Sequence, residues 1–167
     1  MSSVCDIVLT VNGRDHHVNV EPRRTLVDAI REDCGLTGTH IGCEHGVCGA
    51  CTVLLDGAPV RACLMFAVQA AGKAIRTVEG LASGDELSVL QRAFMEHHGL
   101  QCGFCTPGFL MLVTGALERE PDIGDDELID VLASNLCRCT GYQNIIKAVR
   151  AVRDGMQQGQ VRAMTRT

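Results

Sequence analysis

Cysteine is the residue type that most constrains how this chain can fold. Ten cysteines occur among 167 residues, and eight of them fall into two groups of four. The first group consists of Cys43, Cys48, Cys51 and Cys63, and the second consists of Cys102, Cys105, Cys137 and Cys139. Four thiolates gathered at one place form the ligand set of a metal ion or an iron–sulfur cluster. The sequence therefore predicts two metal centres.

The spacing of the first group indicates a 2Fe–2S cluster. Four residues separate Cys43 from Cys48, two separate Cys48 from Cys51, and Cys63 follows in a later segment. This is the spacing of plant-type 2Fe–2S ligands. Residues 37–51 are also rich in glycine and show no hydrophobic period. Because glycine readily adopts positive φ angles, such a loop can turn its backbone N–H groups toward a cluster.

Other ligand chemistries are compatible with parts of this pattern. Zinc is the alternative at each group, because four thiolates also suit a tetrahedral structural site. Visible absorption that bleaches on reduction identifies iron and sulfide, since a zinc site is colourless. His40 and His45 flank Cys43, so histidine ligation of the Rieske type is a further alternative at the first group. Cys5 and Cys34 lie outside both groups, and we interpret them as small hydrophobic residues of the interior.

Composition and charge exclude several classes of protein. The formal net charge is −5, whereas a nucleic-acid-binding protein carries a basic surplus. No apolar run approaches the ~20 residues that a membrane span requires, and the N-terminus lacks the basic and apolar regions of a secretory signal. Reducing compartments keep thiols free, so ten cysteines without an export signal predict metal ligation in a cytoplasmic protein.

The first half of the chain has the hydrophobic pattern of two hairpins and one helix. Asn12-Gly13 and Asp56-Gly57 are tight-turn dipeptides, and Thr25 is in position to cap a helix over residues 25–33. Strands are expected within residues 7–11, 16–20, 52–55, 60–63 and 74–78. A hairpin, a helix, a cluster loop and further strands follow one another in the order of a β-grasp ferredoxin-like domain, which we assign to residues 1–78.

Helical periodicity predominates after Gly80 and predicts a second domain at residues 79–158, followed by a polar tail at 159–167. Four helices are expected over residues 87–97, 108–118, 125–133 and 144–156. The predicted fold class is therefore α+β, with an N-terminal β-grasp 2Fe–2S domain followed by a C-terminal four-helix 2Fe–2S domain.

Two details of the helical half can be tested directly. Leu128, Ile129 and Leu132 are expected on one buried face of the third helix. Thr106 and Thr140 each follow a cysteine of the second group, and we expect them to cap helices. The partial positive charge and free N–H groups of both helix N-termini would then favour an anionic cluster between them.

Three long motifs resemble the small iron–sulfur subunit of the molybdenum hydroxylase (xanthine oxidase) family, which includes bacterial aerobic CO dehydrogenases and N-heterocycle hydroxylases. The motifs are GCEHGVCGACTV at 42–53, QCGFCTPG at 101–108 and CRCTGY at 137–142. Their order and separation also agree with the family, so the resemblance spans roughly residues 4–155. One departure is Gly46-Val47, which stands where CO dehydrogenases carry Ser-His.

The resemblance implies two 2Fe–2S clusters, a large partner subunit with a molybdenum–pterin cofactor, and a medium partner subunit with FAD. It implies a heterotrimer that can itself dimerise and that oxidises an N-heteroaromatic compound, an aldehyde or CO. Electrons would pass from molybdenum to the helical-domain cluster, then to the ferredoxin-domain cluster, and then to FAD. By resemblance Gln101 and Cys139 contact the pterin, whereas the residues alone leave Gln101 as a partner of the local backbone.

The leading prediction is therefore an electron-transfer subunit of an oxidoreductase complex. We find no catalytic residue, because nothing in the chain resembles a Ser–His–Asp set, a P-loop or a dinucleotide fingerprint. A substrate-converting site is expected on a partner rather than on this chain. The alternative is a free-standing two-cluster ferredoxin that carries electrons between enzymes. Purification distinguishes the two, because a carrier is isolated alone and a subunit is isolated with its partners.

Overall fold

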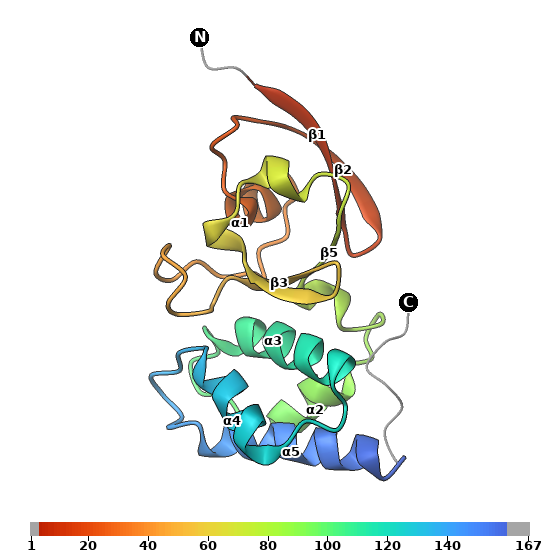
Figure 1. The fold of residues 1–167 in the computed structure, drawn as a ribbon, viewed down its shortest axis with the longest axis vertical. Coiled ribbons are helices and arrows are strands. Elements are labelled where there is room, and N and C mark those ends of the chain that lie inside the picture. Colours follow the sequence, from red (N-terminus) through yellow and green to blue (C-terminus); the bar gives the residue numbers. More distant parts are fainter. Residues whose placement is uncertain (1–3, 160–167) are drawn as a thin grey trace.

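A computed structural model describes residues 4–159 as a sheet domain stacked on a helical domain (Figure 1). The strands are β1 Cys5–Val11, β2 Arg14–Val20, β3 Thr52–Leu55, β4 Ala58–Arg61 and β5 Ala74–Arg76. They form one sheet in the order β2-β1-β5-β3-β4. The central pair β1–β5 is parallel, and the other neighbours are antiparallel. This mixed sheet with its packed helix confirms the predicted β-grasp fold.

Both predicted hairpin turns form as the sequence indicates. Asn12 and Gly13 have φ angles of 51° and 75°, and Asp56 and Gly57 have φ angles of 50° and 82°. Two successive positive φ angles match the right-handed twist of the flanking strands, which is why Asn-Gly and Asp-Gly are favoured there. The turns therefore set the register of both hairpins.

The helix of the sheet domain begins where Thr25 caps it. The Thr25 hydroxyl oxygen accepts a 3.2 Å hydrogen bond from the backbone N–H of Asp28, and α1 spans Leu26–Asp28. The helix then widens into a π-helical turn over Ala29–Asp33, which the sequence pattern does not reveal. Its buried side chains join the hydrophobic core beneath the sheet.

The helical domain contains the four predicted helices. They are α2 Val89–Glu96, α3 Thr106–Arg119, α4 Asp125–Ala133 and α5 Gln143–Gln157. Helix α3 lies between strand β3 and the other helices (Figure 1), and all of its residues from Gly108 to Leu117 are buried. A helix that is apolar on every side suits this position, because both of its faces are covered.

Two expectations about the helical domain are wrong. Ile129 is 37% exposed, whereas Leu128 and Leu132 are buried, because Ile129 lies at the edge of the apolar face, about 100° around the helix from Leu128. Thr106 does not cap α3, because Cys105 already has helical backbone angles and takes the N-cap position. Thr140 also caps no helix, since Tyr142 is the N-cap residue of α5.

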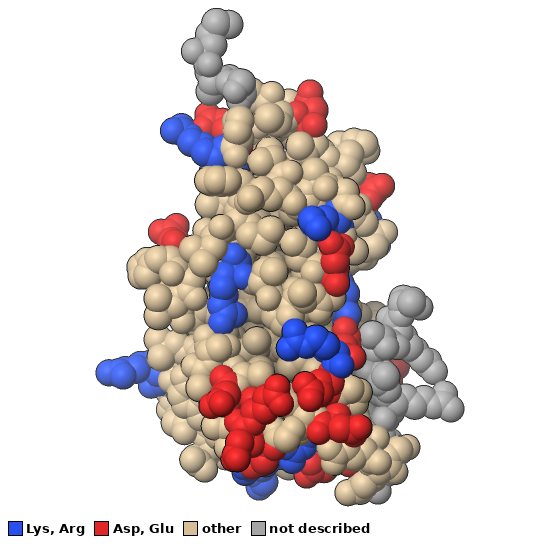
Figure 2. Space-filling model, viewed as in Figure 1, with Lys and Arg blue, Asp and Glu red and all other residues tan. Residues whose placement is uncertain are grey.

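Charge is unevenly distributed over the surface. Helix α4 begins with three acidic residues, Asp125, Asp126 and Glu127, which suit the positive end of the helix dipole. Figure 2 shows acidic side chains gathered over the helical domain and no comparable basic area on the face drawn. Across residues 4–159, no helix combines the length and the apolar composition needed to cross a bilayer.

Candidate iron–sulfur sites

The first group of cysteines lies at the edge of the sheet domain that faces the helices. Cys43 and Cys48 lie on the loop that precedes β3, Cys51 immediately precedes this strand, and Cys63 lies on a single 3-10 turn after β4. The Cys43 thiol lies against Cys48, and the Cys51 thiol lies against Cys63 and also feels the charge of Cys48. A 2Fe–2S cluster takes two protein ligands on each of its irons, so this paired arrangement fits a binuclear cluster.

The backbone of the first loop is turned toward the Cys43 sulfur. The Cys48 N–H donates a 3.3 Å hydrogen bond to the Cys43 Sγ atom. This amide, together with those of His45 and Val47, lowers the pKa of the Cys43 thiol to about 6. The loop therefore stabilises negative charge on sulfur, as its glycine-rich composition predicts.

Glycine is required at two positions of this loop. Gly49 has a φ angle of 71°, and a Cβ atom there would lie 1.9 Å from the Asn135 Oδ1 atom. A Cβ atom on Gly42 would lie 2.9 Å from the Cys48 Sγ atom. Any larger side chain at either position would therefore push apart the loop and its neighbours.

The second group of cysteines lies where the loops before α3 and α5 meet. The Sγ atoms of Cys102 and Cys139 are 3.5 Å apart, and the thiols of Cys105 and Cys137 interact as the second pair. The Cys137 Sγ atom lies 3.1 Å from the Thr140 hydroxyl. Cys102 and Cys139 are exposed, whereas Cys137 is buried and Cys105 is half-buried.

The thiols of the two groups differ in how readily they ionise. Burial raises the pKa of Cys51 and of Cys105, each to about 12, so neither thiol ionises readily without a cation. A coordinating metal removes that proton, because its charge dominates the local electrostatics. The Cys137 thiol differs: burial opposes its ionisation, but hydrogen bonds from Thr140 and from the Cys139 amide lower its pKa.

A buried hydroxyl group gives a further test of the fit. The Thr106 Oγ1 atom, one residue after Cys105, is buried and has no hydrogen-bond partner among the described residues. A buried hydroxyl normally finds a partner, and the sulfur atoms of a cluster at this position would accept its hydrogen bond. The residues present therefore fit a 2Fe–2S group.

Tyr142 supports the second site, although the sequence alone assigns it no role. Its hydroxyl oxygen accepts a 2.9 Å hydrogen bond from the Cys137 N–H and donates a 2.9 Å hydrogen bond to the Asn135 carbonyl. Its ring packs edge-on against Phe109, with centroids 6.1 Å apart. Tyr142 is the only tyrosine in the chain and ends the third motif, which is the signal that could have identified it.

The two sites are neighbours across the domain interface. The Leu136 N–H donates a 2.9 Å hydrogen bond to the Cys48 carbonyl, and the buried Asn135 side chain donates one of 3.3 Å to the Gly49 carbonyl. Nearby, Arg61 donates a 2.8 Å hydrogen bond to the Ser134 carbonyl. The segment that leads to Cys137 is therefore held against the first cluster loop.

The remaining predicted residues lie apart from these two groups or at their edge. The Gln101 side chain is exposed beside Cys102. Cys5 and Cys34 are half-buried and join neither group; burial, followed by the charge of Asp33, raises the pKa of Cys34 to about 11. Neither cysteine is as fully buried as expected.

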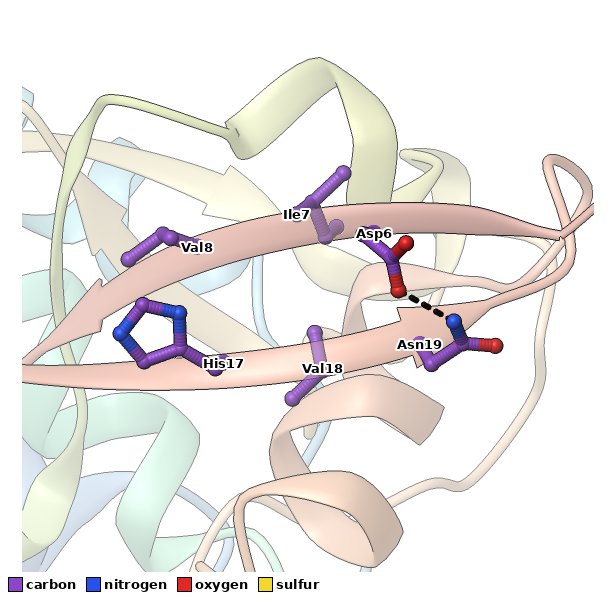
Figure 3. Close-up of a pocket in the computed structure, with 6 residues that line it drawn as sticks. All are labelled: Asp6, Ile7, Val8, His17, Val18 and Asn19. Carbon is purple, nitrogen blue, oxygen red and sulfur yellow. Dashed lines mark hydrogen bonds between the residues drawn. The ribbon is translucent and has the colours of Figure 1, made fainter.

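A shallow hollow on the β1–β2 hairpin is separate from the cysteine chemistry (Figure 3). Only these two adjacent strands line it, and the Asp6 carboxylate accepts a hydrogen bond from the Asn19 amide at one end. Its lining residues are Asp6, Ile7, Val8, His17, Val18 and Asn19. None of the eight grouped cysteines contributes to it, so the hollow adds nothing to the two sites.

Family models divide the chain in the same way as its two cysteine groups. A model described as a 2Fe–2S iron–sulfur cluster binding domain matches residues 9–77. A second, described as a 2Fe–2S binding domain, matches residues 77–150. The chain is therefore a protein that binds two 2Fe–2S clusters, one in each domain.

Similarity to individual proteins defines the family. The gamma subunit of caffeine dehydrogenase from Pseudomonas sp. (strain CBB1) is 56% identical over 149 residues, which cover 87% of this chain and 89% of that subunit. A chain of quinoline 2-oxidoreductase from Pseudomonas putida 86 superposes with a TM-score of 0.88 at 52% identity, covering 96% of this chain and 100% of that chain. Aldehyde oxidoreductase from Desulfovibrio gigas superposes with a TM-score of 0.86 at 39% identity, covering 93% of this chain but 17% of the other.

The chain belongs to the small iron–sulfur subunits of the molybdenum hydroxylase family. It is accordingly an iron–sulfur subunit of an oxidoreductase complex. In the Desulfovibrio enzyme the corresponding fold is only part of a much longer chain.

Proposed function

We propose that this chain relays electrons from a molybdenum–pterin centre on a large partner subunit to FAD on a medium partner subunit. The helical-domain cluster would receive the electrons first, and the ferredoxin-domain cluster would pass them on. The clusters supply the one-electron chemistry, and the chain supplies their ligands and spacing. The observation that carries this proposal is the hydrogen bond from Leu136 to Cys48, because it joins the residue before Cys137 to a cysteine of the first group.

The proposed cluster ligands follow from the thiol pairs. The ferredoxin-domain cluster is assigned to Cys43, Cys48, Cys51 and Cys63, and the helical-domain cluster to Cys102, Cys105, Cys137 and Cys139. The proposed ferredoxin-like domain is residues 1–78, and the proposed helical domain is residues 79–158. A polar tail is assigned to residues 159–167, of which 160–167 lie outside the described part of the chain.

Surface exposure supports an entry point for electrons at the second site. Gln101, Cys102 and Cys139 are all exposed in this chain. Ligands exposed at the surface let a cofactor on another subunit approach, whereas ligands buried in a domain core do not. We therefore assign Gln101 and Cys139 to contact with the pterin on the large subunit.

Partners and substrate follow from the named relatives. Caffeine and quinoline are nitrogen heterocycles, and the relatives that act on them match nearly the whole of this chain. The proposed complex is a heterotrimer, located in the cytoplasm, that oxidises an N-heteroaromatic compound, with an aldehyde as the second substrate class. We assign discrimination between these substrates to the large subunit, which would hold the molybdenum–pterin cofactor.

The ligand assignment is tested by Cys105→Ala, with Cys34→Ala as the matched control, in the intact complex. Cys105→Ala is expected to reduce the iron content from about four atoms to about two atoms per chain and to stop electron transfer from substrate to acceptor. Cys34→Ala is expected to retain both properties. A Cys105→Ala complex with full iron and full turnover would show that the ligand assignment is wrong.

A further inference from the structure

His40 and Phe104 form an aromatic contact between the two domains, beside both cysteine groups. Their rings are stacked, with centroids 4.8 Å apart and an angle of 25° between the ring planes. The His40 Nδ1 atom also lies 2.7 Å from the Phe104 carbonyl oxygen. Because a carbonyl oxygen can only accept, the N–H at Nδ1 is the donor. The two residues therefore make two separate interactions.

The segment before His40 is held by hydrogen bonds with Arg31 and Glu79. The Arg31 guanidinium donates hydrogen bonds of 2.6 Å and 2.7 Å to the carbonyls of Thr37 and Thr39. The Glu79 carboxylate accepts a 2.8 Å hydrogen bond from the Gly38 N–H. These contacts fix the backbone that presents the His40 ring, so the ring provides a firm support for whatever stacks on it.

Phe104 belongs to the second site but reaches the first. It lies between Cys102 and Cys105 in sequence, so its backbone is part of the second cluster loop. Its ring atom Cε1 lies 3.6 Å from the position that a Cβ atom on Gly42 would take. That same position is 2.9 Å from the Cys48 Sγ atom. The Phe104 ring therefore packs over the first cluster loop.

We propose that His40 and Phe104 are a pair of positioning residues that sets the separation and orientation of the two cluster loops. Neither residue ligates iron in this assignment. The stacked rings and the hydrogen bond connect the 102–105 loop to the 40–43 segment, separately from the hydrogen bonds that residues 134–136 make with the sheet domain. Attachment of both the 102–105 loop and the 134–136 segment to the first cluster loop and its strands restricts rotation of one cluster loop on the other more than attachment of either segment alone. The expected effect of this pair on electron transfer rests on the proposed relay, whereas its effect on the arrangement of the two loops does not.

The test uses the intact complex with Phe104→Ala and His40→Ala. Phe104→Tyr keeps an aromatic ring at the contact and serves as the rescue variant. Phe66→Ala is the matched control, because Phe66 is 48% exposed and Phe104 is 49% exposed, but Phe66 has no stacked partner among the described residues. The His40 variant leaves the Cys102–Cys105 loop unaltered, so it tests the contact even if Phe104→Ala loses iron.

Two measurements report on the pair. The first is the magnetic interaction between the two reduced clusters in electron paramagnetic resonance spectra, which depends on their separation and orientation. The second is the rate at which the ferredoxin-domain cluster is reduced after the helical-domain cluster in a single turnover. His40→Ala and Phe104→Ala are expected to weaken or broaden the magnetic interaction and to slow this rate several-fold. Phe104→Tyr and Phe66→Ala are expected to give wild-type values.

The outcomes separate the pair from the relay. If both alanine variants keep their iron, the wild-type magnetic interaction and the wild-type rate, the positioning role is overturned. If the wild-type complex itself passes no electrons between its clusters, the proposed relay fails. The magnetic interaction still decides the positioning role in that case, because it requires reduced clusters but no turnover.

Discussion

The backbone N–H of Leu136 donates a 2.9 Å hydrogen bond to the carbonyl oxygen of Cys48, and this bond links the two halves of the molecule. Leu136 immediately precedes Cys137 of the second group, and Cys48 belongs to the first. Leu136 is 52% exposed, and its hydrogen bond across the interface comes from the backbone. The bond therefore gives a direct contact between the segment before Cys137 and the first cluster loop, which are far apart in sequence.

Replacing Leu136 with proline is expected to break this link, because proline has no N–H to donate. The Cys48 carbonyl would lose its donor, at a cost of roughly 1–3 kcal/mol in the free energy of unfolding, and transfer between the clusters would slow. Leu136→Ala keeps the N–H and is the matched control. Denaturant unfolding and single-turnover reduction are the measurements. Equal effects of the two substitutions would mean that the hydrogen bond contributes nothing.

Gly108 is expected to tolerate no side chain, because α3 lies directly against the first cluster loop there. A Cβ atom on Gly108 would lie 2.4 Å from the Gly49 carbonyl oxygen. Gly108→Ala should therefore push the domains apart and cost about 1–3 kcal/mol. Gly124→Ala is the control, since nothing lies within 4 Å of a Cβ atom at that position. Thermal unfolding of both variants checks this, and a Gly108 variant as stable as the control would contradict it.

Local patterns predicted most of the fold and the presence of two cluster-binding domains. The spacing of the eight cysteines indicated two clusters, and both turn dipeptides and all four long helices formed where the hydrophobic periodicity predicted them. These features depend on residues close together in sequence. The sequence pattern did not predict the π-helical turn after α1 or the exposed position of Ile129. Each depends on small differences in local geometry that a periodic pattern does not resolve.

Contacts between the domains could not be predicted from the sequence. Asn135 approaches Gly49, and Phe104 approaches His40, across 86 and 64 residues of chain respectively. No periodicity connects residues so far apart, and each residue has an ordinary local explanation on its own. Their roles become visible only when α3 is placed against β3, which brings the two cluster loops together (Figure 1).

Removing the hydroxyl of Tyr142 is expected to affect the helical-domain cluster selectively. Tyr142→Phe keeps the ring that packs against Phe109 but deprives the Cys137 N–H and the Asn135 carbonyl of their shared partner. The variant should lose roughly 1–3 kcal/mol of stability and shift the reduction potential of this cluster. Redox titration followed by electron paramagnetic resonance measures both clusters in one sample, so the ferredoxin-domain cluster is the internal control. Equal shifts in both clusters would contradict a local role for the hydroxyl.

Cys34 is expected to be alkylated slowly at neutral pH, although it lies outside both cluster sites. Burial raises its pKa to about 11, and the charge of Asp33 acts in the same direction. Only the thiolate reacts, so the rate should climb about tenfold for each pH unit and level off near the pKa. Brief iodoacetamide pulses on the intact complex, followed by peptide mass spectrometry, measure this profile. Asp33→Asn removes the neighbouring charge and should shift the profile to lower pH, but by less than the whole displacement, because burial is the larger cause. If the alkylation rate of Cys34 no longer rose above pH 9, the folded chain would not suppress ionisation of this thiol.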